Sequence, residues 1–206
     1  MQLATIDQLH VLSEQILADM QGKTAEEKKK ICIDAVYDLL VLAYVYGNQR
    51  TTSEIPSDIA QLLVESGNLD SEGNIPVDTN DLYTALYEPI AGETFEQRIS
   101  KRIDEETLDR RTLNRILETD WHRMEETGAY DTARTVSAKT GRNAYKVWKT
   151  MLDDRVRDTH WYIQDVEVPI SERFYTFDGD SAMCPGGFSE ADNNVNCRCW
   201  LTYTYR

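Results

Sequence analysis

The stretch "AVYDLLVLAYVYG", residues 35–47, decides how the chain folds, because it is apolar on nearly every side of a helix. It carries Asp38 and is shorter than the ~20 residues that a membrane span needs, so we expect a buried helix and no membrane contact. Helical spacing continues its apolar stripe over Ile31, Val36, Leu39, Leu40 and Ala43. The helix must be covered, either by other helices of this chain or by a partner.

Shorter helices are predicted on both sides of this core helix. Residues 6–20 place leucine, isoleucine and methionine side chains on one face, as an amphipathic helix does. Thr24 and Glu27 have the spacing of a capping box, which opens the core helix. Gly47 and Asn48 are expected to end it, because glycine and asparagine are common just after a helix.

Two short helices are expected next. The first lies within residues 53–67, with Ser57 or Asp58 as its N-cap and Gly67 as its end. The second lies within residues 78–90 and is expected to end near Pro89.

The segment from residue 94 to 138 is highly charged and helical in pattern. A break is expected near Glu106 and Thr107, where Thr107 would be the N-cap of the second part. Acids and bases alternate along the outer face, which is typical of solvated ion pairs rather than of a reactive site.

The pattern changes after Gly141. Residues 166–177 are rich in β-branched and aromatic side chains, and "VNCRCWLTYTY", residues 195–205, alternates as a strand does. The predicted fold class is therefore α+β, a mostly helical N-terminal body with a small α+β C-terminal domain that ends in a β-strand. We divide the chain into a helical N-terminal region, a long helical segment and the C-terminal domain, at residues 1–94, 95–146 and 147–206.

The charge of the chain is strongly acidic and unevenly distributed. The net charge is −14, which excludes unspecific DNA binding by the whole surface. Residues 1–100 hold 17 acids and 6 bases, a net charge of −11, and residues 101–206 hold 19 acids and 16 bases, a net charge of −3. A partner of the first half is therefore expected to be a basic protein surface, and any contact with DNA is expected in the second half.

Three motifs follow one another in the second half of the chain. They are "RILETDWHRMEETGAYDTA" at 115–133, "WKTMLDDRVRDTH" at 148–160 and "NCRC" at 196–199. In this order and spacing they resemble the phage Mu F-like minor head proteins, also called phage head morphogenesis proteins, over about residues 95–206. The residues that carry the resemblance are Thr119, Asp120, Arg123, Trp148, Asp153, Arg155, Arg157, His160, Asn196, Cys197, Arg198 and Cys199.

The resemblance implies a non-enzymatic minor head protein that acts in head morphogenesis. Its implied partners are the portal protein or capsid subunits, with a role in DNA packaging or ejection and a weak contact with DNA. Its implied place is the virion, in the head interior or at the portal vertex, and the host cytoplasm during assembly. Residues 1–94 match no known pattern and are expected to dock the protein to the head. Related domains also stand at the front of bacterial toxins, so a delivery module without its toxin is an alternative.

The cluster at 148–163 allows two interpretations. In one, Asp153 and His160 form an acid–base pair and Arg157 steadies an anion, as in a zinc-dependent hydrolase that also uses the late cysteines. In the other, which we favour, Asp153 pairs with Arg157 in a semi-buried ion-pair network that includes His160. No glycine-rich anion loop or evident nucleophile stands nearby in the sequence, so no catalytic residue is expected.

The late cysteines leave a metal site open as an alternative. Cys184, Cys197, Cys199 and His160 would make a Cys3His set, which suits zinc. The favoured expectation is that the cysteines are reduced core residues and that no cofactor is bound. A disulfide is disfavoured in a cytosolic assembly pathway.

A basic patch is a further hypothesis for the long helical segment. It would consist of Arg110, Arg111, Arg115 and Arg123 and would contact DNA. The alternative is a solvated face with interleaved acids, which is the more common situation for such a charge run.

Overall fold

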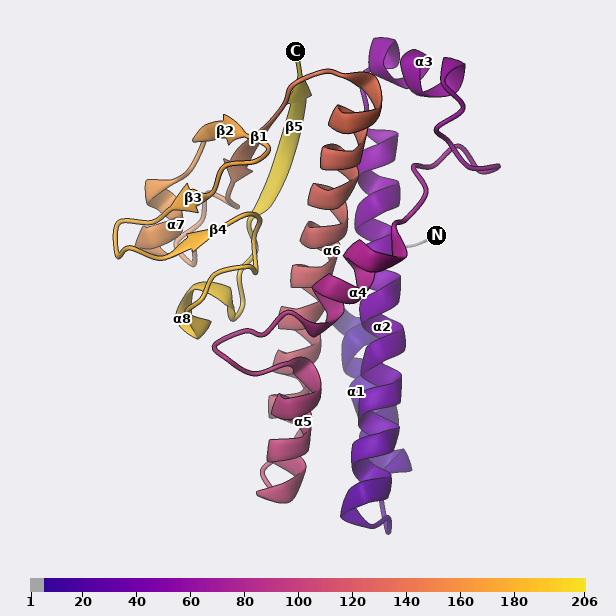
Figure 1. The fold of residues 1–206 in the computed structure, drawn as a ribbon. Helices are drawn as coiled ribbons and strands as arrows, with labels where there is room; N and C mark the ends of the chain where they lie inside the picture. The colour runs from indigo at the N-terminus through magenta and orange to yellow at the C-terminus, as the bar shows by residue number, and fades with distance from the viewer. Residues whose placement is uncertain (1–5) are drawn as a thin grey trace.

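The computed structural model describes residues 6–206, which fold into a helical body and a small sheet domain (Figure 1). The helices within these residues are α1 (Ile6–Asp19), α2 (Ala25–Ser53), α3 (Ser57–Glu65), α4 (Thr79–Tyr87), α5 (Phe95–Asp104), α6 (Arg110–Thr140), α7 (Asp158–Tyr162) and α8 (Ala191–Asn194). The strands are β1 (Ala144–Lys149), β2 (Glu167–Pro169), β3 (Phe174–Tyr175), β4 (Ser181–Ala182) and β5 (Trp200–Tyr205). The predicted α+β class is confirmed.

One of the predicted helix caps is confirmed and two are wrong. The capping box of Thr24 and Glu27 opens α2 as predicted. The long segment does break near residue 106, but the carboxylate of Asp109, not Thr107, accepts from the backbone and caps α6. At α3 the N-cap is Pro56, with no side-chain cap, so neither Ser57 nor Asp58 has that role.

Gly47 does not end the core helix, which continues to Ser53. A methyl group on Gly47 would stand 1.9 Å from the backbone oxygen of Glu125, and one on Gly128 would stand 2.1 Å from that of Tyr44. The two glycines therefore let the backbones of α2 and α6 approach at their crossing, where any side chain would separate them. The glycine that resembles a helix stop in the sequence is a packing residue.

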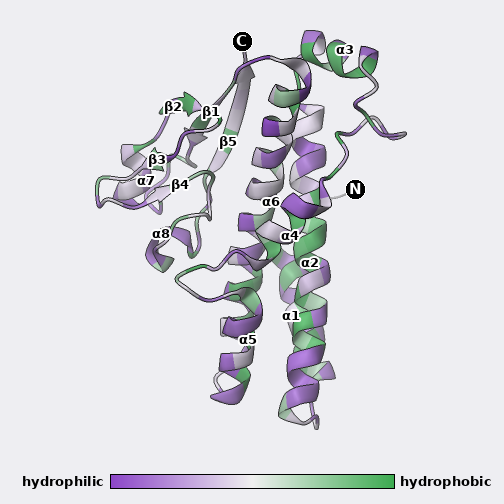
Figure 2. Ribbon diagram, in the orientation of Figure 1, coloured by the Kyte–Doolittle hydropathy of each residue, from purple (hydrophilic) through white to green (hydrophobic). Residues whose placement is uncertain are grey.

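Other helices of this chain cover the apolar faces of α2. Its apolar side chains, Leu40 among them, share one core with residues of α1, α4, α5 and α6, including Leu9, Ile16, Leu86, Ile99 and Leu117. Figure 2 shows the apolar character along α2. Within residues 6–206, α2 is the one helix that is long and apolar enough, by length and composition, to cross a membrane. Residues 35–47 alone are too short for a membrane span, and the full length of α2 corrects the expectation drawn from them. In this fold it is the central helix of the core, and the described residues before α5, 6–94, share that core with α5 and α6.

The C-terminal sheet has three antiparallel strands in the order β2–β1–β5. Strand β1 was not predicted, and its first residues fall in the segment that was assigned to a long helix; that helix ends at Gly141, whose φ of 68° is left-handed. Strand β5 begins at Trp200, so the predicted strand over 195–205 is wrong in its first half. Residues 195–199 leave α8 in a turn and an irregular segment, which places Cys197 and Cys199 before the strand.

The long helix α6 lies between α2 and the C-terminal sheet (Figure 1). One of its faces belongs to the helical core, and another meets β1 and β5. A second apolar core lies inside the C-terminal domain around Trp148, Phe174 and Phe188. A third, smaller core joins α3 to the end of α6 through Leu63, Ile75 and Val136.

Candidate functional site

The first motif lies on α6 and ties three helices together. The Arg98 guanidinium donates to both carboxylate oxygens of Asp120, each at 2.7 Å. Arg123 stands 3.6 Å from the same carboxylate and donates to the Ala85 carbonyl at 2.6 Å. Asp120 and Arg123 are almost fully buried, so this is a desolvated charge cluster between α4, α5 and α6. The hydroxyl of Thr119 is buried beside it and has no hydrogen-bond partner among the described residues.

The same stretch of α6 packs against the C-terminal domain. A methyl group on Gly186 would stand 2.8 Å from the Cα of Arg123, so the proline–glycine turn lies directly on the helix. Thr127 contacts the Sγ atom of Cys184 at 3.7 Å. The turn at 184–187 therefore packs on residues 123–127 of α6.

Glu126 joins both halves of the molecule, and sequence reasoning missed it. Its buried carboxylate accepts from Arg50 of α2 at 2.7 Å and from the backbone N–H of Leu201 in β5 at 3.1 Å. Arg50 also pairs with Glu125. Burial raises the pKa of Glu125, although the charge of Arg50 opposes that shift. The signal in the sequence was a pair of adjacent acids within the first motif.

The cluster at 148–163 is not the predicted network. Asp153 receives both Arg198 nitrogens, at 2.6 and 2.8 Å, and lies 3.6 Å from Arg155. The hydrogen bonds from Arg198 lower the pKa of Asp153 to about 2. Arg157 does not pair with Asp153; it donates to the Val195 carbonyl instead. The prediction fails because residues 150–157 are a loop, so helical spacing does not apply to them.

Asp153 is also not part of a buried polar core with His160. Its side chain is 32% exposed, whereas His160 is 1% exposed and lies in the apolar core of the domain. The imidazole stacks on Phe188 and meets the edge of Trp148, with ring centroids 5.2 and 5.5 Å apart. A carboxylate that is ionised down to pH 2 and clamped by an arginine is a poor general base.

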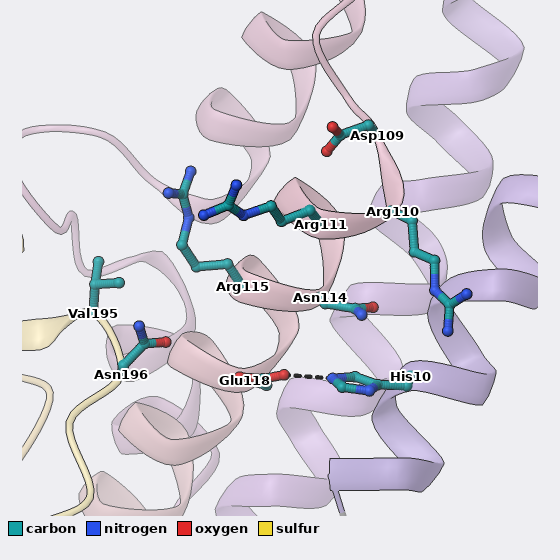
Figure 3. A pocket seen from close by; sticks show the side chains of 9 residues that line it. All are labelled: His10, Asp109, Arg110, Arg111, Asn114, Arg115, Glu118, Val195 and Asn196. Carbon is teal, nitrogen blue, oxygen red and sulfur yellow. Dashed lines mark hydrogen bonds and ion pairs between the residues drawn. The ribbon is translucent and has the colours of Figure 1, made fainter. Parts of the chain in front are cut away.

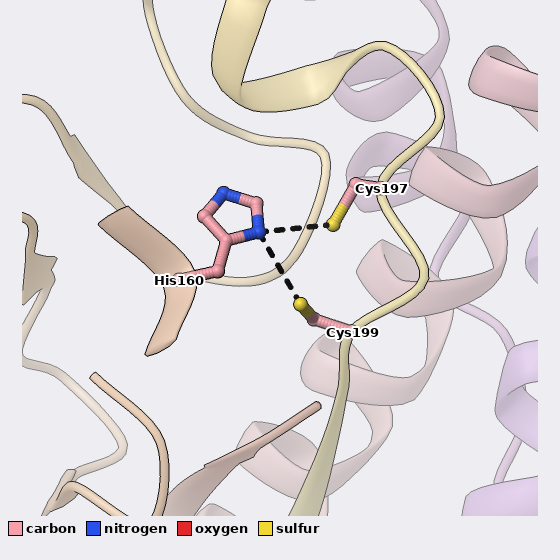
Figure 4. Close-up of side chains that lie close together, drawn as sticks. All are labelled: His160, Cys197 and Cys199. Carbon is pink, nitrogen blue, oxygen red and sulfur yellow. Dashed lines mark hydrogen bonds between the residues drawn. The ribbon is translucent and has the colours of Figure 1, made fainter. Parts of the chain in front are cut away.

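Two of the late cysteines face His160 (Figure 4). The Nδ1 atom of His160 lies 3.3 Å from the Sγ atom of Cys199 and 3.7 Å from that of Cys197. The three ligand atoms lie within 4.8 Å of one another, and all three residues are buried. Cys184 does not belong to this group, which corrects the Cys3His set proposed from the sequence; its thiol is held by Thr127.

A second histidine, His122 of α6, approaches the same cluster. Its imidazole interacts with the Cys197 thiol, which raises the pKa of His122 although burial opposes the shift. The Nε2 atoms of both His122 and His160 are buried and have no hydrogen-bond partner among residues 6–206. Nothing in the spacing of the sequence joined His122 to the cysteines.

Asn196 positions the two cysteines. It adopts a left-handed conformation with φ of 56°, which asparagine tolerates better than most residues. The turn it makes redirects the chain from α8 into the segment 197–199. This accounts physically for an asparagine directly before the first cysteine.

Asp180 and Lys146 are buried polar residues that the sequence did not single out. The Asp180 carboxylate accepts hydrogen bonds from the backbone or side chains of Ser181, Ser189, Glu190 and Asn193. Burial raises the pKa of Asp180, but these hydrogen bonds outweigh it and lower the pKa to about 2. Burial lowers the pKa of Lys146 to about 8, and its ammonium donates to the Met183 carbonyl at 2.7 Å.

The arginines of α6 do not form one patch. Arg123 is buried, whereas the side chains of Arg110, Arg111 and Arg115 line an open hollow of about 700 Å³ near His10 and Asn196 (Figure 3). Arg110 pairs with Glu14 at 2.6 Å. Arg111 and Arg115 point to the same side of α6, and neither makes an ion pair within the described part of the chain. His10 is bound to Glu118 at 2.6 Å.

One protein family matches the part of the chain that holds these motifs. The family model described as "Phage Mu protein F like protein" matches residues 80–202. The chain belongs to this family. The match begins inside α4, earlier than residue 95, which agrees with the Mu F-like domain using Ala85 of α4 to hold Arg123.

Two curated relatives are each similar to more than half of this chain. Minor head protein GP7 of Bacillus phage SPP1 is 30% identical over 117 residues, which cover 55% of this chain and 36% of that protein. The NAD(+)–arginine ADP-ribosyltransferase EFV of Enterococcus faecalis is 33% identical over 125 residues, which cover 59% of this chain and 24% of that enzyme. The chain thus spans about a third and a quarter of these relatives. No solved structure matches it significantly.

Proposed function

We propose that this Mu F-like protein is a structural, non-enzymatic component of the phage head that docks to the portal protein or to capsid subunits. The observation that carries the proposal is the family match together with the similarity to a minor head protein. It implies a place in the virion, in the head interior or at the portal vertex, and in the host cytoplasm during assembly. A role in DNA packaging or ejection belongs to the same proposal.

The geometry of the motif residues supports a structural role. The charged motif residues Asp120, Arg123 and Asp153 each have a charged partner that holds them in place. The histidine and cysteines lie inside the core and not in an open cleft. A hydrolase would need a reactive group that reaches substrate, and the proposed pair of Asp153 and His160 is divided between an exposed ion pair and the apolar core.

The docking surface is proposed on the helical region 1–94. The exposed residues Asp34, Asp38 and Leu42 follow one another at four-residue spacing on the outer face of α2. With the net charge of −11 in the first hundred residues, this face suits a basic surface on a portal or capsid subunit. The C-terminal domain offers a competing surface, because Tyr162 and Phe177 are exposed and contact each other with ring centroids 5.8 Å apart.

Charge reversal tests this proposal without disturbing the shared core. Asp34→Lys combined with Asp38→Lys is expected to fold normally and to lose association with procapsids in co-sedimentation. The matched control is Tyr162→Ser combined with Phe177→Ser, which is expected to associate as the wild type does. If the control loses association and the charge-reversed protein keeps it, docking lies on the C-terminal domain and the proposal for residues 1–94 is wrong.

We propose a weak contact with DNA at Arg111 and Arg115. These two guanidinium groups are the part of the predicted patch that stays exposed and without an ion pair within residues 6–206. Replacing both by glutamine should reduce the retention of the protein on DNA at low salt and leave its thermal stability unchanged.

The similarity to part of an enzyme supports one second candidate, a delivery domain that precedes an enzyme. The matched stretch is 24% of that ADP-ribosyltransferase, as expected for a domain that accompanies the catalytic part. In this case the chain itself would still be inactive. Fusing a reporter enzyme to its C-terminus and finding the reporter inside virions would support delivery, whereas exclusion of the reporter would count against it.

A further inference from the structure

We propose that Cys197, Cys199, His160 and His122 form a structural zinc site that fastens the C-terminal domain to helix α6. The first three side chains come from the segment before β5 and from α7, and the fourth comes from α6. The site differs from the set suggested by the sequence, because Cys184 is absent from it and His122 is included. This inference does not depend on the proposed docking surface.

The two nitrogen–sulfur distances in the cluster fit a tetrahedral zinc site. Zinc binds sulfur at about 2.3 Å and imidazole nitrogen at about 2.0–2.1 Å, which places neighbouring sulfur and nitrogen ligands about 3.5 Å apart. The observed separations from the Nδ1 atom of His160 are 3.3 Å to Cys199 and 3.7 Å to Cys197 (Figure 4). The three ligand atoms thus stand around one common point.

His122 supplies the fourth ligand. It lies beside Cys197, and its Nε2 atom is buried without a hydrogen-bond partner among the described residues. A buried polar atom without a partner destabilises the fold, and coordination of a metal removes that cost. His122 lies outside the three ligand atoms that are within 4.8 Å of one another, so its side chain must move toward them to complete a Cys2His2 set.

The charge and burial of the cluster also favour a structural ion. Two thiolates balance the charge of one Zn²⁺, and two neutral imidazoles add none, so the loaded site is neutral inside an apolar core. His160 is 1% exposed, Cys199 2% and Cys197 6%, which leaves no open position for a substrate. Closed four-ligand sites of this kind are structural, whereas catalytic zinc keeps one position open.

The coordination links segments that the fold must hold together. His122 belongs to the long helix, His160 to the short helix α7, and the cysteines to the irregular segment after α8. The three-residue segment 197–199 has no regular secondary structure of its own. A zinc ion here would fix that segment and α7 against α6.

Elemental analysis of the full-length protein tests the site. The protein is purified with a tag that does not bind metal, and one zinc per chain is expected. Cys197→Ser and Cys199→Ser are expected to abolish zinc binding. The matched control is Cys184→Ser, which removes another buried cysteine of the same domain and is expected to keep one zinc per chain. Absence of zinc in the wild type, also after addition of Zn²⁺ and gel filtration, overturns the proposal, as does loss of zinc in the Cys184 variant.

A second measurement covers variants that fail to fold. The wild-type protein is unfolded in chelator and refolded with Co²⁺, whose visible absorption reports coordination geometry and thiolate ligation. Tetrahedral bands with a thiolate charge-transfer band are expected, and the spectrum of a hydrated octahedral ion would refute the site. Removing a residue that only hydrogen-bonds to a metal ligand already lowers metal affinity by about 10–100-fold. Loss of a direct ligand should cost at least as much, so His122→Ala should weaken Zn²⁺ binding at least about tenfold. Unchanged affinity in that variant would refute the assignment of His122.

Discussion

Where α2 and α6 approach each other closely, replacing glycine by alanine is expected to destabilise the protein, which is the opposite of its usual effect in a helix. Replacing glycine by alanine inside a helix normally stabilises it by about 1 kcal/mol. At Gly47 the new methyl group would stand 1.9 Å from the Glu125 oxygen, and real contacts of this kind do not fall below 3.0 Å. The two backbones must therefore move apart by at least 1.1 Å, the difference between these distances. This movement opens the buried contacts on both sides of the helix crossing.

The expected cost can be derived from this displacement. A gap of about 0.5–1 Å already removes a quarter to a half of each dispersion contact. Overpacking that shifts a backbone costs about 1–3 kcal/mol, and the upper end applies here because a backbone atom cannot turn aside. Subtracting the gain in helix propensity leaves a net destabilisation of about 2 kcal/mol, which lowers the melting temperature of a chain of this size by about 4–8 °C.

Thermal unfolding followed by circular dichroism measures the effect. Gly47→Ala and Gly128→Ala should each melt below the wild type, whereas Asp38→Ala on the exposed face of α2 should stay within about 0.5 kcal/mol of it. The double glycine variant should lose less than the sum of the single losses, because the first methyl group already separates the helices. A melting temperature at or above that of the wild type in either single variant would refute the close crossing.

Three further outcomes are expected. Glu126→Ala leaves the Leu201 N–H without its partner and leaves Arg50 paired with Glu125 alone, so urea unfolding should show a loss of about 1–3 kcal/mol; no measurable loss would mean that water replaces the carboxylate. The lowered pKa of Asp180, about 2 against about 3.9 in the unfolded chain, adds stability above pH 4 that disappears as the pH falls toward 2. The melting temperatures of Asp180→Asn and the wild type should therefore converge over that range, and a constant gap would contradict this. The purified chain should transfer no label from biotinylated NAD⁺ to arginine-containing proteins, and labelling above a heat-treated sample would show an enzymatic activity.

Local sequence determined most of the helices and the fold class. The capping box of Thr24 and Glu27, the apolar stripe of α2 and the change of pattern after Gly141 depend on residues within a few positions of each other, so spacing alone reveals them. The motifs of the second half were likewise sufficient to indicate the family. Strand β1 was missed because "AYKVWK" carries two lysines, and its identity as a strand depends on pairing with β2 and β5.

Only the tertiary structure decided what the polar residues contact. Asp153 takes its partner from 45 positions away in Arg198, and His160 meets cysteines 37 and 39 positions away, so no helical or strand spacing can predict either contact. Gly47 resembles a helix end in the sequence, and the opposing backbone of α6 gives it another role. Capping and amphipathic patterns act over one or two turns of the chain, whereas burial and charge pairing depend on which segments the complete fold brings together.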